Sequence, residues 1–145
     1  MYTTVQFLHS YWAYLVLAVL VITTINSIIG FVGDKEYGAK DMRLALFTLI
    51  TMHIQLLIGI VVWLVSPLGL GYIRENGMGG MASEIRKLAL EHPTLMIVAI
   101  VLVTVGYSKH KKKLVSKPKF KLLAIFYTLA LIAILAMIPW NQWFN

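Results

Sequence analysis

The sequence predicts an all-α, polytopic membrane protein: a four-transmembrane-helix bundle formed by a single domain that covers residues 1–145. The first observation is composition, since 59% of the residues are hydrophobic and only 13% are charged. A soluble domain of this size would have difficulty hiding so much apolar surface. The second is distribution, because four long apolar segments cover about 7–32, 44–65, 88–107 and 120–140. Each is near the roughly 20 residues that a membrane-spanning helix needs.

The orientation follows from the distribution of lysine. The link between the third and fourth spans carries seven lysines and no acid: Lys109, Lys111, Lys112, Lys113, Lys117, Lys119 and Lys121. The positive-inside rule places this link in the cytoplasm, so both termini and the loop 66–87 are expected outside. We identify no removable signal peptide, and the first helix would direct insertion. We interpret the lysine run as a topology signal, with binding to anionic lipid of the bilayer as an alternative. The net charge of +7 predicts no nucleic-acid partner, because the positive residues lie against a membrane and lack interleaved aromatics.

The first span carries a histidine near its outer start. His9 shares a helical face with small, apolar and hydroxyl residues, namely Ala13, Val16, Leu20, Thr23, Ser27 and Gly30. In membranes, small and hydroxyl residues favour close packing against other helices. We therefore expect His9 to point into the bundle.

The second span has its own stripe of polar and small residues: Thr48, Thr51, Gln55, Gly59 and Ser66. His53 lies about 200° around the helix from Gln55 and near mid-membrane, so it should face a different neighbour. Asp41 is expected to cap the start of this helix.

The third span must begin before Pro93, because the uncharged run 93–108 has only 16 residues. A start near Leu88 draws Glu91 and His92 into the outer edge of the bilayer, where ionisable groups are costly and functional by default. One face of this helix carries His92, Met96, Ala99, Val103, Gly106 and His110. We interpret His110 as a solvated member of the lysine-rich link.

The outer end of the bundle should be framed by cations and aromatics. Residues 83–88 resemble an amphipathic turn of helix at the membrane surface. Arg74, Arg86 and Lys87 would then lie at the outer mouth. The aromatics that close the chain, Trp140, Trp143 and Phe144, are expected to form an interfacial belt.

His9 and His92 are the candidate cofactor ligands, because both stand near the outer start of a span and at nearly equal depth. Two inward imidazoles at one level can hold a planar haem between helices. Arg74, Arg86 and Lys87 would meet its propionates, and Glu91, about 100° around the helix from His92, would flank the site. Two alternatives are a zinc, copper or iron site made by both histidines and Glu91, and interfacial histidines hydrogen-bonded to neighbours. The absence of cysteine excludes covalently attached haem.

Several short motifs carry a resemblance to a known family. They are Phe7-Leu8-His9, Leu44-Ala45-Leu46-Phe47-Thr48-Leu49, Gln55-Leu56-Leu57-Ile58-Gly59, Glu91-His92-Pro93 and Ile138-Pro139-Trp140. Together they resemble short four-span bacterial membrane proteins described as cytochrome b-like. The layout is also similar to that of the HemJ-type haem-binding protoporphyrinogen oxidases. The resemblance implies haem b held by His9 and His92, in the bacterial inner (cytoplasmic) membrane. Those oxidases carry a lysine two residues after the third-span histidine, whereas this sequence has Thr94.

Three functions remain open at this level. The first is electron transfer near the periplasmic face, with a membrane redox partner or quinone. The second is a haem-dependent porphyrinogen or quinol oxidoreductase, with Glu91 as proton acceptor. The third is a haem-free accessory subunit, in which His53 and the polar stripes contact a larger membrane complex; the chain could also form a homo-oligomer.

Overall fold

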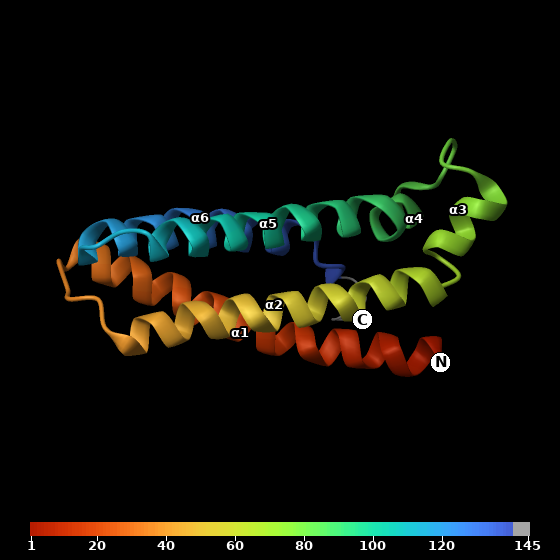
Figure 1. Cartoon of the computed structure of the whole chain (residues 1–145). Helices are drawn as coiled ribbons and strands as arrows, with labels where there is room; N and C mark the ends of the chain where they lie inside the picture. Colours follow the sequence, from red (N-terminus) through yellow and green to blue (C-terminus); the bar gives the residue numbers. More distant parts are fainter. Residues whose placement is uncertain (141–145) are drawn as a thin grey trace.

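The computed structural model describes residues 1–140, and this range contains helices and loops but no strand. The elements follow in the order α1 (Tyr2–Val32), α2 (Ala39–Val65), α3 (Leu70–Asn76), α4 (Ser83–Arg86), η1 (Lys87–Glu91), α5 (His92–Lys111) and α6 (Ser116–Met137). Figure 1 shows α1, α2, α5 and α6 lying lengthwise beside one another, with α3 beyond the end of the bundle that holds the N-terminus. The predicted all-α four-helix bundle is confirmed.

The helices are suited to a membrane by length and by surface. Four helical stretches are long and apolar enough to cross one: Tyr2–Val32, Ala39–Asn76, Ser83–Lys111 and Ser116–Met137. Their outward faces expose large apolar side chains, among them Ile25, Leu57, Val101 and Ile132, which water would solvate poorly but lipid would accept. The chain is thus a multi-pass membrane protein. Helices α1 and α2 begin earlier than the apolar segments predicted, at Tyr2 and Ala39.

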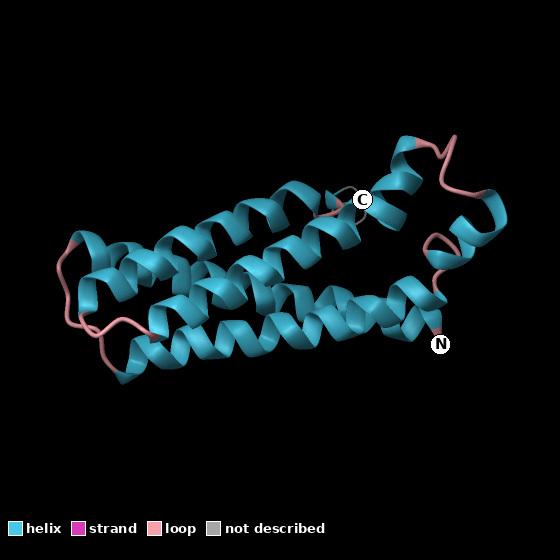
Figure 2. Cartoon of the chain, turned by 45° about the horizontal axis from the view of Figure 1, so that its top comes forward, coloured by secondary structure: helices cyan, strands magenta, loops and turns pink. Residues whose placement is uncertain are grey.

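The four long helices form a ring. Helix α1 packs against α2 and α6, and α5 packs against the same two helices. Helices α1 and α5 therefore lie on the diagonal of the bundle. Figure 2 shows the long helices side by side in a view turned by 45° from that of Figure 1. Side chains that point inward from α1 and α5 can meet at the centre.

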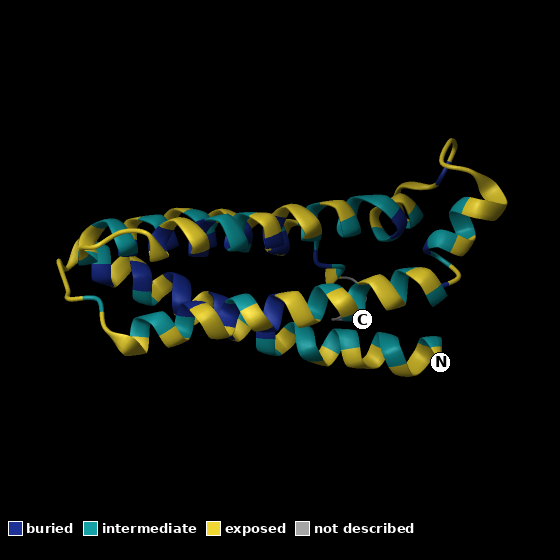
Figure 3. Cartoon of the chain, viewed as in Figure 1, coloured by how far each residue is buried: buried dark blue, intermediate teal, exposed yellow. Residues whose placement is uncertain are grey.

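On α1, α2 and α5 the buried side chains are confined to one half of the bundle, whereas those of α6 extend as far as Ile134 (Figure 3). The buried residues of α1 begin at Val16, those of α2 end at Met52, and those of α5 begin at Ala99. All three sets lie toward the end that carries the loop 33–38. The other half, which contains His9 and His92, has only partly buried or exposed side chains on these three described helices.

Close helix contacts hold the buried half together. A Cβ atom at Gly106 of α5 would lie 2.9 Å from Phe126 Cγ of α6, and still closer to its Cβ. Hydroxyl groups also bond between helices, as Thr23 Oγ1 and Thr48 Oγ1 lie 2.8 Å apart. Tyr127 donates its hydroxyl hydrogen to the Ala45 carbonyl at 2.9 Å. The small and hydroxyl faces that the sequence predicted are therefore the packed faces.

The prediction that His110 is solvated was wrong. Its side chain is fully buried, and its Nε2 lies 2.7 Å from the hydroxyl oxygen of Tyr37. Tyr37 belongs to the loop 33–38, which folds over the end of α5 and is fixed by a bond from the Tyr37 amide to Ser116 Oγ at 2.8 Å. Asp41 caps α2, as predicted, by accepting from the Gly38 amide at 2.8 Å. Trp143 and Phe144 of the predicted aromatic belt lie outside the described residues.

Candidate functional site

The two candidate ligand histidines meet across the diagonal of the bundle. His9 comes from α1 and His92 from the first turn of α5, and their ring centroids lie 6.3 Å apart. The ring planes are nearly perpendicular, at 87°. Both predicted features, inward orientation and similar depth, are confirmed.

His92 is oriented by the end of α6. Its Nδ1 lies 2.9 Å from the carbonyl oxygen of Met137. A carbonyl only accepts, so Nδ1 carries the hydrogen and donates it. In a neutral imidazole the hydrogen on Nδ1 leaves the lone pair of Nε2 free, which is the arrangement of a metal-binding histidine with a supported ring.

The chain that leads into His92 has an irregular helical turn. Residues Lys87–Glu91 form the π-helical η1, in which the His92 amide bonds to the Lys87 carbonyl, and such turns are frequent at functional sites. Pro93 follows and has no amide hydrogen, so it cannot donate to the Ala89 carbonyl as another residue would in an α-helix. Trp63 of α2 donates to this carbonyl instead, at 2.8 Å. Helix α2 thereby holds the turn before His92.

His9 is also held by α2. Gln55 donates its side-chain amide to the His9 backbone carbonyl at 2.8 Å. Gly59, one turn later, faces the imidazole, and a Cβ at this position would lie 3.2 Å from His9 Cε1. Two buried polar atoms in this contact, His9 Nδ1 and Gln55 Oε1, have no hydrogen-bond partner in the described part of the chain.

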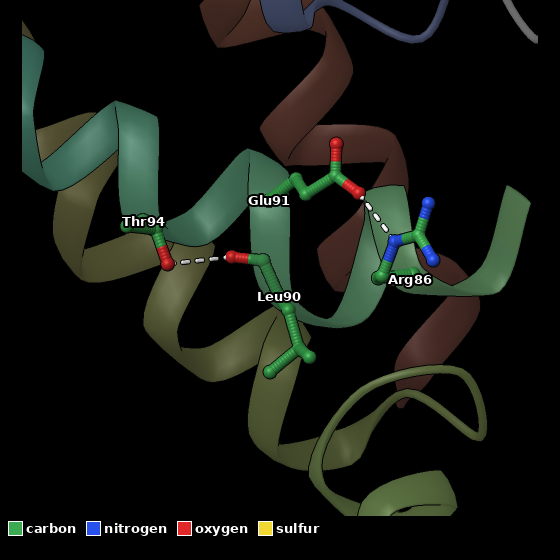
Figure 4. A network of polar contacts seen from close by, with 4 residues as sticks. All are labelled: Arg86, Leu90, Glu91 and Thr94. Carbon is green, nitrogen blue, oxygen red and sulfur yellow. Dashed lines mark hydrogen bonds and ion pairs between the residues drawn. The ribbon is translucent and has the colours of Figure 1, made fainter. Parts of the chain in front are cut away.

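Glu91 does not contact the histidine pair by any described hydrogen bond. Its Oε2 accepts from Arg86 Nε at 2.8 Å in a partly exposed ion pair, shown in Figure 4 beside the bond from Thr94 Oγ1 to the Leu90 carbonyl. Within residues 1–140, no group of three or more metal-binding side chains comes together. The described residues therefore do not bring Glu91 together with His9 and His92 as a three-ligand group.

The predicted cations lie at the end of the bundle that holds His9 and His92, and no described bond joins them to the imidazoles. Arg86 is occupied by Glu91, while Arg74 in α3 and Lys87 in η1 are exposed. Helix α3 packs against η1 and the end of α2, which brings Arg74 to the same end of the bundle as Lys87.

His53 lies apart from the histidine pair. Its Nδ1 is 2.8 Å from the Leu49 carbonyl of its own helix, and its Nε2 is 3.4 Å from Thr104 Oγ1 of α5. The side chain is exposed on the outside of the bundle. His53 therefore faces a different neighbour from Gln55, as its angular position predicted.

Sequence reasoning missed three contacts that support the site: the Gln55 amide with the His9 carbonyl, the Trp63 indole with the Ala89 carbonyl, and the Met137 carbonyl with His92. Gln55, Gly59 and Trp63 are spaced four residues apart and so share one face of α2. This spacing was a signal that could have extended the predicted stripe to Trp63. The Met137 contact is made by the backbone and leaves no trace in residue type.

Comparisons with known protein families, with curated proteins and with solved structures find no match for this chain.

Proposed function

We propose that the protein is a small membrane cytochrome in which His9 and His92 are the axial ligands of one b-type haem. The observation that carries the proposal is the diagonal pair of inward imidazoles, one of which already has its Nδ1 engaged by a carbonyl. Two histidines from facing helices are a known way to hold haem in a bundle.

The spacing of the rings fits this role. A nitrogen–metal bond is about 2 Å long and the ring centroid lies roughly 1 Å behind the nitrogen, so the centroids of a coaxial pair lie roughly 6 Å apart. The observed separation is 6.3 Å. The chemistry of the donors fits as well, because imidazole is a standard axial ligand and the absence of cysteine leaves non-covalent attachment.

The packing of the bundle also favours this end for a cofactor. The fully buried side chains of α1, α2 and α5 lie in the opposite half. Around His9 and His92, the side chains of these three helices are partly buried or exposed. Gly59 adds to this by presenting no side chain to the His9 ring.

A haem with two histidine ligands supplies reversible one-electron transfer, because it leaves no iron position for a substrate. We therefore propose electron transfer to or from a membrane partner, such as a quinone, as the function. Arg74 and Lys87 are exposed cations near this end of the bundle and would attract the carboxylate groups of the haem propionates. Glu91 is paired with Arg86, which gives the alternative of an oxidoreductase with Glu91 as proton acceptor less support.

Absorption spectra of histidine variants test the proposal. The reduced-minus-oxidised spectrum of the purified protein should contain sharp bands of low-spin haem, and His9→Ala or His92→Ala should abolish them. His53→Ala is the matched control, since it removes an imidazole that lies outside the pair, and it should keep the bands. If both pair variants retained the wild-type spectrum, the ligand assignment would be wrong. A preparation that stays colourless after haem is supplied would favour the haem-free accessory subunit.

We further propose that the histidine pair lies at the periplasmic side of a bacterial inner membrane. The lysine-rich link, at the opposite end of the bundle from His9, is the basis of this orientation. A periplasm-specific reporter fused after Asn145 should be active, and a cytoplasm-specific reporter at the same point should be silent. The reverse result would put the histidine pair at the cytoplasmic side.

A further inference from the structure

Helix α2 contributes no ligand to the histidine pair, yet it contacts the segments that carry both histidines. Its residues Gln55, Gly59 and Trp63 lie on one face, one turn apart. Gln55 bonds to the His9 backbone, Gly59 borders the His9 ring, and Trp63 bonds to the Ala89 carbonyl in the turn before His92. The face therefore spans both halves of the site.

The two histidines differ in how their rings are supported. His92 donates its Nδ1 hydrogen to the Met137 carbonyl. His9 Nδ1 is buried and has no hydrogen-bond partner in the described residues. A buried polar atom without a partner is costly, so native structures rarely leave one.

The side chain of Gln55 offers the missing partner. Its Nε2 is used by the His9 carbonyl, which leaves Oε1 as a pure acceptor, buried and also unpaired. His9 Nδ1 can carry a hydrogen and Gln55 Oε1 can accept one, and the two side chains lie beside each other. A hydrogen bond between these two atoms would satisfy both.

We propose that Gln55 is the positioning residue of His9: its Oε1 accepts the Nδ1 hydrogen of His9 and so fixes the tautomer that presents Nε2 toward His92. The role of Gln55 in positioning a haem ligand rests on the proposed haem function. The hydrogen bond between Gln55 and His9 does not depend on it. Gln55 would do for His9 what the Met137 carbonyl does for His92, and both rings would then offer Nε2. Gly59 leaves the room in which the ring adopts this orientation.

The test compares Gln55→Met with Thr51→Val. Methionine keeps the length of the side chain but removes the amide. Thr51 is the matched control, because its hydroxyl is buried one turn earlier on α2 and bonds to the Thr48 carbonyl at 3.0 Å. Loss of a partner that orients a ligand lowers metal affinity roughly 10- to 100-fold. We expect Gln55→Met to lower haem affinity about tenfold and Thr51→Val to change it less than about twofold.

A second measurement reads the tautomer directly. Nitrogen-15 NMR of the imidazoles in the haem-free protein should show hydrogen on Nδ1 of both His9 and His92. Gln55→Met should change the His9 signals and leave those of His92 in place. Unchanged His9 signals together with unchanged haem affinity would overturn the role of Gln55. A colourless wild-type protein would overturn the haem function alone, because the NMR measurement needs no haem.

Gly59→Ala provides an independent variant if Gln55→Met does not fold. Its Cβ would lie 3.2 Å from His9 Cε1, so the ring must move away from α2 and from Gln55. The His9 signals should shift while the His92 signals stay in place. No shift at His9 in a folded Gly59→Ala protein would contradict the proposed contact between this face and the ring.

Discussion

The contact between α5 and α6 gives the most quantitative prediction, because Gly106 has no room for a side chain. The Cβ of a Gly106→Ala variant would lie 2.9 Å from Phe126 Cγ, whereas carbon atoms pack at about 3.5–4.0 Å. The obstacle is the base of the phenylalanine side chain, which cannot rotate away. The helices would have to separate by about 1 Å, and overpacking of this kind typically lowers the free energy of unfolding by about 1–3 kcal/mol.

Unfolding of the purified protein by SDS in mixed micelles measures this effect. Gly79→Ala is the control, since a Cβ at Gly79 meets no atom within 4 Å and its φ is not left-handed. A surface change of this kind should alter the free energy of unfolding by no more than about 0.5 kcal/mol. Equal stability of Gly106→Ala and Gly79→Ala would refute the close packing of α5 on α6 at this position.

Two further predictions concern single hydrogen bonds. Trp63→Phe should lower the free energy of unfolding by about 0.6–2 kcal/mol, because it leaves the buried Ala89 carbonyl without the indole donor. Unfolding in SDS measures this loss. A variant as stable as wild type would show that this bond does not hold the turn. Burial, with a smaller effect of Asp41, raises the pKa of Tyr37 above its ordinary value of 10. Above pH 10 the unfolded chain would lose this proton while the folded protein keeps it, so stability should fall as the pH rises, and less steeply in Tyr37→Phe. Identical pH dependence in both proteins would argue against a half-buried Tyr37 that stays protonated in the folded protein.

Much of the fold could be predicted from the sequence, because helical period and residue size determine which faces pack. The stripe that includes Thr23 and Ser27 in α1, and the face with Ala99 and Val103 in α5, are buried as expected. His110 lies on this same face, yet its lysine neighbours suggested solvent. The loop that carries Tyr37 folds back over it, and such a contact between distant segments is not encoded in local periodicity.

The sequence could predict that His9 and His92 lie together, but not the contacts that support them. His9 and His92 could be paired from depth alone. The π-helical turn before His92 and the bond from Trp63 to the Ala89 carbonyl depend on how α2 meets that turn. The support of His92 is a backbone carbonyl at the end of α6, and any residue type could supply it. Arg86 was expected beside a propionate, whereas a carboxylate five residues along the chain occupies it.

The central claim, that His9 and His92 together bind one haem, is tested most directly by electron paramagnetic resonance of the oxidised protein loaded with haem b. Wild type should give the signal of low-spin iron with two imidazole ligands, at one haem per chain. His9→Ala and His92→Ala should each lose that signal, while His53→Ala keeps it. A wild-type protein that binds no haem, or a low-spin signal that survives in both variants of the pair, would contradict the claim.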